Sequence, residues 1–190
     1  MAALTAVLLT SGTATAAGTN SAEEVRTGKG SGTAGATAEY NGRVIDLSKG
    51  WQGASICVEQ TFDNFLCYDD EASYRAAEHL DSSLPSTGTR AYTDCPSGYF
   101  CLWDNANYNN GSFPRVQYRT LGTHNLASIG FTNRANSVYN NRSGWTVAAD
   151  DTCSSETLWV ETRISELSNW QRQYCSGSWN NKIDRVTLRS

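Results

Sequence analysis

The stretch TNRANSV, residues 132–138, decides the fold because a related stretch, NNKIDRV, follows at residues 180–186. The two stretches lie 48 positions apart. In each, an asparagine (Asn133 or Asn181) is followed three residues later by a polar pair that directly precedes a valine. Similarity at a fixed period of about 20–50 residues indicates a repeated supersecondary unit. We therefore expect two equivalent corners, one in each half of a duplicated β fold.

The residues around these corners have the composition of a β domain. From residue 92 to the end, short aromatic-rich segments alternate with turns that are rich in asparagine and glycine. Strands at such spacing are typical of a sandwich, and asparagine and glycine accept the backbone conformations that tight turns need. The sequence predicts a mainly β domain over residues 92–190, without a helix of any length.

The run FCLWDNANYNNGSF, residues 100–113, resembles the first hairpin of a βγ-crystallin Greek key. Trp103 and Tyr108 supply its two aromatics, and Asn110 stands where that family has a turn glycine. Asparagine tolerates the left-handed conformation, so the resemblance still implies a double Greek-key sandwich. The opening CPSGYFCLW, residues 95–103, is also similar to a family of secreted actinomycete peptidase inhibitors, the streptomycete metalloproteinase inhibitor type, which has this fold.

The resemblance covers about half of the chain and implies a secreted, non-catalytic inhibitor of an extracellular peptidase, with metallopeptidases as the expected class. An inhibitor needs a rigid loop whose conformational entropy is already removed, and the disulfide-closed loops 95–101 and 150–177 both qualify. Thermolysin-like enzymes favour bulky apolar residues beside the scissile bond, which points to the longer loop. Its expected contact residues are Leu158, Trp159, Val160 and Trp170. The alternative is that Trp159 and Trp170 belong to the core of the second Greek key.

In βγ-crystallins the paired corner motif can bind calcium through side-chain and backbone oxygens. The resemblance places possible calcium ligands at Asn133, Asn136, Ser137, Asn180, Asn181 and Asp184. Because only one of these is acidic, and because Arg185 stands where a hydroxyl is expected, calcium binding should be weak or absent. The alternative is that these side chains cap strands by hydrogen bonds to the backbone. No cofactor is required.

The cysteines and the first residues indicate export. An apolar run within residues 1–17 precedes the small-residue pattern ATA, which is typical of a signal peptide, although no basic residue precedes the run and the signal could be truncated. Six cysteines allow 15 pairings, and oxidising compartments preserve disulfides. They fall in three close pairs, so we expect Cys57 with Cys67, Cys95 with Cys101, and Cys153 with Cys175.

The N-terminal half divides into a disordered linker at 18–38, a small α+β unit at 39–80 and a second linker at 81–91. Within the small unit, Asn41-Gly42 predicts a hairpin, residues 51–57 a turn or helical piece, and residues 62–68 a strand. A helix over 71–80, capped by Asp69 or Asp70, completes it. We expect this helix to bury Ala72, Ala76 and Leu80 and to expose Arg75, Glu78 and His79.

Charge and motif content exclude several function classes. A net charge of -4 and a pI near 5.1 favour neither nucleic acid nor an anionic membrane as a partner. His79 and His124 lie beside no nucleophile motif, and the acid pairs 69–70 and 150–151 are typical of solvated turns, so we expect no enzyme.

We also expect a monomer, with a peptidase as the partner and a polysaccharide as a second possibility. The alternative functions are a carbohydrate-binding, cell-wall-binding or antimicrobial module, through Tyr99, Trp103 and Tyr108, and a calcium-responsive structural module.

Overall fold

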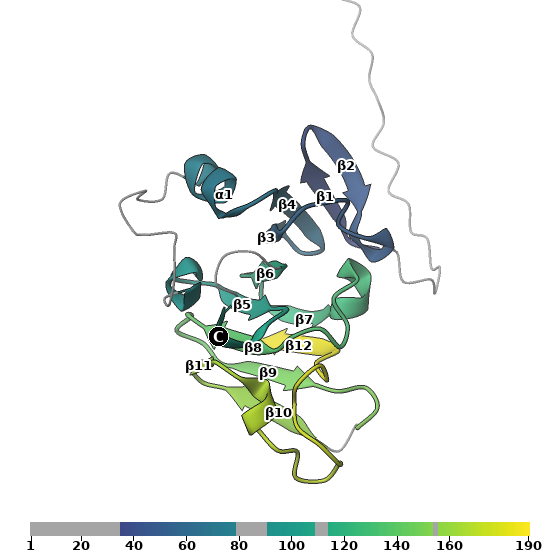
Figure 1. Ribbon diagram of the computed structural model, residues 1–190, viewed down its shortest axis with the longest axis vertical. Coiled ribbons are helices and arrows are strands. Elements are labelled where there is room, and N and C mark those ends of the chain that lie inside the picture. The colour runs from purple at the N-terminus through teal and green to yellow at the C-terminus, as the bar shows by residue number, and fades with distance from the viewer. Residues whose placement is uncertain (1–34, 79–90, 109–113, 154–155) are drawn as a thin grey trace, which may run out of the picture. The chain divides into compact units, whose positions relative to one another are not determined.

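A computed structural model describes residues 35–78, 91–108, 114–153 and 156–190 (Figure 1). The signal peptide expected at 1–17 and nearly all of the linkers expected at 18–38 and 81–91 lie outside these ranges. The described residues form twelve strands in two sheets and one α-helix, which confirms the mainly β prediction. They include no helix with the length and apolarity of a membrane span.

The C-terminal half is a double Greek key. Its strands are β5 (Phe100–Trp103), β6 (Arg115–Tyr118), β7 (Gly122–Asn125), β8 (Ser137–Asn140), β9 (Thr146–Ala149), β10 (Thr157–Val160), β11 (Arg163–Ile164) and β12 (Arg185–Leu188). They are arranged in the orders β11-β8-β5-β6 and β10-β9-β12-β7. The first key consists of β5 to β8 and the second of β9 to β12. Each group of four strands holds three strands of one key together with the third strand of the other, which is β11 in the first group and β7 in the second. This exchange confirms the duplicated fold that the sequence predicts.

The two asparagine corners bond to each other. The backbone N–H of Asn133 donates to the carbonyl of Ile183 at 3.1 Å, and that of Asn181 donates to the carbonyl of Ala135 at 3.0 Å. Both asparagines have a φ of 55°, and Ala135 and Ile183 are fully buried between the sheets. The repeat in the sequence thus corresponds to two equivalent corners that hold the keys together.

This equivalence predicts a matched mutational response. Asn133→Val and Asn181→Val should each lower the free energy of unfolding by about 1–3 kcal/mol, because a β-branched residue strains a left-handed backbone. The control variants Asn133→Gly and Asn181→Gly should stay within about 1 kcal/mol of the wild type, because glycine accepts positive φ. Urea unfolding measures both. A corner that accepts valine without loss would show that the two are not equivalent.

The N-terminal strands extend the first sheet. They are β1 (Thr37–Tyr40), β2 (Arg43–Asp46), β3 (Ile56–Thr61) and β4 (Asn64–Tyr68). β3 pairs in parallel with β6, so residues 39–80 share one sheet with the C-terminal half. Asn41 and Gly42, at φ 50° and 71°, form the predicted hairpin turn. The expected turn or helical piece at 51–57 is wrong at its end, because Ile56 and Cys57 begin β3.

The helix α1 (Glu71–Ala77) begins at a capping box formed by Asp70 and Ser73, but its buried face is not the predicted one. Glu71, Tyr74 and Arg75 are buried, whereas Ala72 and Ala76 are exposed.

The cause of this inversion is a buried ionic network. Arg75 contacts Glu71 at 2.9 Å and Asp94 at 2.5 Å, and Arg115 contacts Glu71 at 3.0 Å. A buried charge is stable only with such partners, so the network turns the charged face of the helix inward. Glu78 is exposed as predicted, and residues 79–80 lie outside the described ranges.

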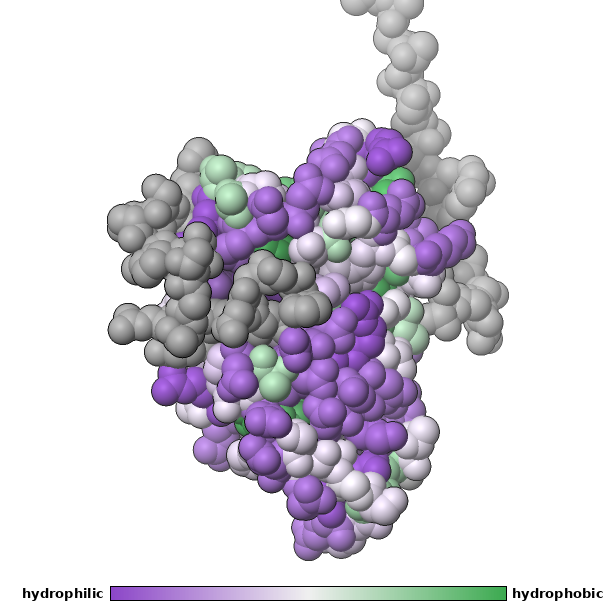
Figure 2. All heavy atoms as spheres, viewed as in Figure 1, coloured by the Kyte–Doolittle hydropathy of each residue, from purple (hydrophilic) through white to green (hydrophobic). Residues whose placement is uncertain are grey.

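The disulfides are sequential. Cys57 is bonded to Cys67 across β3 and β4, Cys95 to Cys101, and Cys153 to Cys175. A continuous core runs through both halves, from Leu47 and Phe65 to Phe131 and Ile183. On the face shown in Figure 2, hydrophobic residues form small green patches among hydrophilic ones. Burial of apolar surface in this core is the main stabilising contribution.

Candidate functional site

An exposed loop at residues 171–178 lies in the connection between β11 and β12 of the second Greek key. At its base, the N–H of Trp179 donates to the carbonyl of Trp170 at 2.9 Å, and Gln171 pairs with Ser178. The disulfide between Cys153 and Cys175 joins this loop to the connection between β9 and β10. We call this segment the braced loop.

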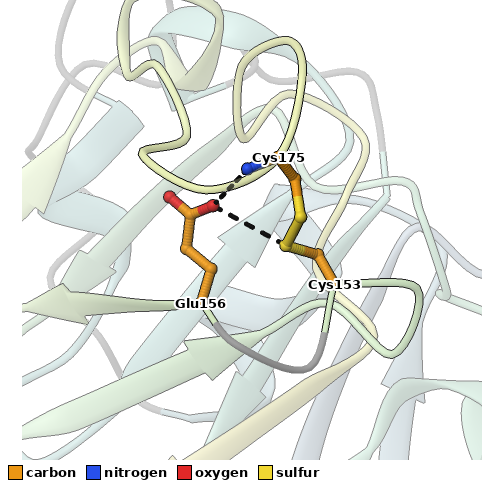
Figure 3. Close-up of side chains that lie close together, drawn as sticks. All are labelled: Cys153, Glu156 and Cys175. Atoms are coloured by element: carbon orange, nitrogen blue, oxygen red, sulfur yellow. Dashed lines mark hydrogen bonds between the residues drawn. A yellow bond between two sulfur atoms is a disulfide. The ribbon is translucent and has the colours of Figure 1, made fainter.

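A buried carboxylate holds the braced loop from inside. Glu156, which directly precedes β10, accepts hydrogen bonds from three consecutive backbone N–H groups, those of Gln173, Tyr174 and Cys175. Figure 3 shows the carboxylate pointing at the Cys175 amide, with one oxygen 3.7 Å from the Cys153 sulfur. Hydrogen bonds to a charged acceptor are about twice as strong as neutral ones. The loop backbone is therefore fixed although the side chains of Gln173 and Tyr174 face solvent.

A buried ion pair gives the loop a third anchor. The Arg172 guanidinium contacts the Asp150 carboxylate at 2.5 Å and also donates to the Ser176 carbonyl within the loop. Burial opposes ionisation of Asp150, but hydrogen bonds from Thr152 and the charge of Arg172 outweigh it and lower the pKa of Asp150. Asp150 was expected to be a solvated turn residue, and its burial corrects that expectation.

The braced loop presents an aromatic side chain on a rigid support. Tyr174 is 67% exposed at its tip, and Gln173, Ser176 and Gly177 are exposed around it. An aromatic side chain on a pre-organised loop offers a large contact area at little further cost in entropy. This combination is suited to binding another protein.

The four contact residues expected from the sequence separate into two pairs. Leu158 and Val160 are 5% and 1% exposed, because they lie on the inner face of β10 and belong to the core, which corrects their expected role. Trp159 and Trp170 are 51% and 47% exposed. The alternative that these two tryptophans are core residues is therefore wrong.

Three of the six expected calcium ligands cap the backbone with their side chains. The Ser137 hydroxyl donates to the Asn105 carbonyl at 2.7 Å and accepts from the Tyr108 N–H at 3.1 Å. Asn136 donates to the Asp104 carbonyl at 2.8 Å, and Asp184 accepts from the Asp151 N–H at 2.8 Å.

The remaining corner residues are held through their backbones or by an ion pair. The backbone N–H groups of Asn133 and Asn181 are bonded across the two corners, and that of Asn180 donates to Ser178 at 3.4 Å. Arg185 pairs with Asp151 at 2.5 Å. The strand-capping alternative therefore holds for Asn136, Ser137 and Asp184, and calcium binding stays a prediction.

One group of potential metal ligands lies close together within the described ranges, and it consists of Cys153, Glu156 and Cys175. Its two sulfurs are already joined in the disulfide, and its carboxylate is engaged by the braced loop. The cluster therefore serves as a structural anchor.

Two other sets of candidate residues are buried. Trp103 and Tyr108 are buried and pack edge to face at 5.3 Å with half-buried Tyr99 against them, so the Trp103 and Tyr108 rings have no open face for a sugar. His124 is buried on β7, between the rings of Phe62 and Tyr118 and 3.3 Å from buried Glu59.

Comparison with known proteins addresses the C-terminal half. Residues 88–160 match the family model Inhibitor_I36, described as peptidase inhibitor family I36. The resemblance to peptidase inhibitors is thereby confirmed. The I36 match indicates an inhibitor of peptidases rather than an enzyme. It includes Cys95, Cys101, Cys153 and Glu156, and it ends before the braced loop.

Further comparisons add one structure. The crystal structure of the N-terminal domain of protein S superposes with a TM-score of 0.37 and 17% sequence identity, over 48% of this chain and 96% of that one. No curated protein gives a significant match.

Three functional residues were not found from the sequence. Glu156, Asp150 and Arg172 follow no motif, and each acts on a partner that is 17 to 22 residues away. The one signal is the position of three acids, Asp150, Asp151 and Glu156, within three residues of Cys153. An acid beside a disulfide-closed loop is a candidate anchor for that loop.

The lowered pKa of Asp150 predicts how the anchor responds to pH. Asp150→Asn should destabilise the protein by about 3–5 kcal/mol at neutral pH, because Arg172 stays buried without its counter-charge. The stabilisation is present above the ordinary pKa of 3.8 and is lost as the pH falls through the lower folded-state pKa. The difference between wild type and variant should therefore shrink at acid pH.

Urea unfolding from about pH 7 down to about pH 2 measures this difference. Asp151→Asn, which changes the exposed neighbour, is the control and should have a small effect at every pH. A difference for Asp150→Asn that stays constant over the whole range would contradict the assignment.

Proposed function

We propose that this protein is a secreted inhibitor of an extracellular metallopeptidase and that the braced loop occupies the cleft of that peptidase. The observation that carries the proposal is the combination of the I36 match with a rigid, exposed loop beside the matched residues. Three disulfides and the signal-like residues 1–17 support export.

The loop chemistry supports a metallopeptidase of the thermolysin-like class. Such enzymes favour bulky apolar residues next to the scissile bond, and Tyr174 is the most exposed aromatic side chain of the described residues. The loop enters a cleft without losing much further entropy, because Glu156, Arg172 and the disulfide already hold it.

The same anchors explain how a substrate-like loop would inhibit rather than be consumed. If the peptide bond beside Tyr174 were cut, the N-terminal side would remain held by Arg172, and the C-terminal side by the Cys175 disulfide. Glu156 binds amides on both sides of that bond. The cut ends would stay together, so release of a product would be slow.

Titration of a thermolysin-like peptidase with the purified protein tests the proposal. We expect stoichiometric loss of activity, and Tyr174→Ala should weaken inhibition at least about tenfold, because a central aromatic anchor typically carries more than 2 kcal/mol of binding energy. Val44→Ala changes an apolar residue on β2 that is 78% exposed, and this control variant should inhibit like the wild type.

The peptidase class is tested in the same experiment. A serine peptidase panel run in parallel should show no inhibition. Inhibition of serine peptidases alone would overturn the metallopeptidase assignment, and equal inhibition by the wild type and Tyr174→Ala would exclude the braced loop as the contact.

A further inference from the structure

A groove beside the outer strand β10 is separate from the exposed tip of the braced loop. Its volume is about 310 Å³, and it is lined by Trp159, Glu161, Thr162, Arg163, Ile164 and Trp170. Both tryptophans are about half exposed, although indole rings usually bury most of their surface. We call this feature the indole groove.

The distribution of tryptophan across the fold sets the indole groove apart. Three tryptophans, Trp51, Trp103 and Trp179, are buried in the core. The other three, Trp145, Trp159 and Trp170, are exposed, and all of them lie at the groove or in contact with a residue that lines it. Exposed aromatic residues that cluster in this way mark a binding surface more often than isolated ones do.

Two of the three exposed indole rings, Trp145 and Trp159, brace each other. Trp145 stacks on Trp159 with ring centroids 4.9 Å apart and planes 20° apart, and its indole N–H donates to the Ser190 carbonyl at 3.0 Å. Trp170 is held through its backbone, which donates to Leu167 and accepts from Trp179. One aromatic wall of the groove, Trp159, is therefore braced by a neighbouring ring before any ligand arrives, and the backbone that carries Trp170 is fixed.

We infer that the indole groove binds a neutral oligosaccharide. A sugar ring has apolar C–H faces and a rim of hydroxyl groups, and the groove offers a matching set of surfaces. The indoles supply flat apolar faces, and Glu161, Thr162 and Arg163, which also line the groove, are residue types that hydrogen-bond to hydroxyl groups.

The charges and the size of the groove support this choice of ligand. One carboxylate and one guanidinium line it, so their opposite charges favour a neutral ligand over an anion or a cation. Its volume lies at the lower end of the roughly 300–1,000 Å³ that small-molecule sites occupy. This inference replaces the sugar-binding surface expected at Tyr99, Trp103 and Tyr108, and it does not depend on peptidase inhibition.

Binding of soluble chitohexaose and cellohexaose to the full chain tests the inference, with calorimetry for affinity and tryptophan fluorescence for the site. At least one of the two should bind with a Kd of roughly 1 mM or tighter. Trp159→Ala should weaken this binding at least about tenfold, and Trp159→Phe should retain part of it because an aromatic face remains.

Two matched variants separate this site from the braced loop. Trp159→Ala should still inhibit a thermolysin-like peptidase, whereas Tyr174→Ala, which does not line the groove, should still bind the sugar. Because Trp159 is exposed, its replacement should leave the melting temperature near that of the wild type, which checks folding. If the peptidase proposal fails, the sugar measurement still stands by itself.

Three results would overturn the inference. The first is no binding of either saccharide to the wild type up to about 10 mM. The second is sugar binding that Trp159→Ala does not change. The third is a wild type that binds neither saccharide together with a Trp159→Ala variant that no longer inhibits the peptidase. That result would make the groove part of the peptidase contact.

Discussion

The carboxylate of Glu156 is the constraint on which the exposed part of this protein depends. It accepts three consecutive backbone N–H groups from Gln173 to Cys175, so a loop without regular secondary structure has a defined backbone. The cost of burying this charge is offset by those hydrogen bonds. The disulfide and the Asp150–Arg172 pair add to the same restraint from two other directions.

The double Greek key places these anchors where they can act together. Asp150 directly follows β9, and Glu156 directly precedes β10, so the connection within one hairpin of the second key supplies both acids. That hairpin is fixed because the two keys exchange their third strands and join at Asn133 and Asn181. The same hairpin turns Leu158 and Val160 into the core and leaves Trp159 outside, so one alternating strand supports both the core and the indole groove.

Local patterns in the sequence predict much of this fold. The corner repeat, the Asn41-Gly42 hairpin and the close cysteine pairs depend on neighbouring residues, and the structure contains all three. Long-range contacts decide the rest. α1 buries Arg75 because Asp94 meets it from another segment, and the parallel pairing of β3 with β6 leaves no local pattern. Glu156 was missed for the same reason, since its partners lie beyond the next strand.

Amide hydrogen exchange at Gln173, Tyr174 and Cys175 tests most directly whether Glu156 fixes the braced loop. The wild-type amides should exchange far more slowly than those of an unstructured peptide, although the side chains of Gln173 and Tyr174 face solvent. In Glu156→Ala, these three amides should lose protection while those of β12 keep theirs. Rapid exchange at all three positions in the wild type would contradict the account, because the loop would then have no fixed conformation to present.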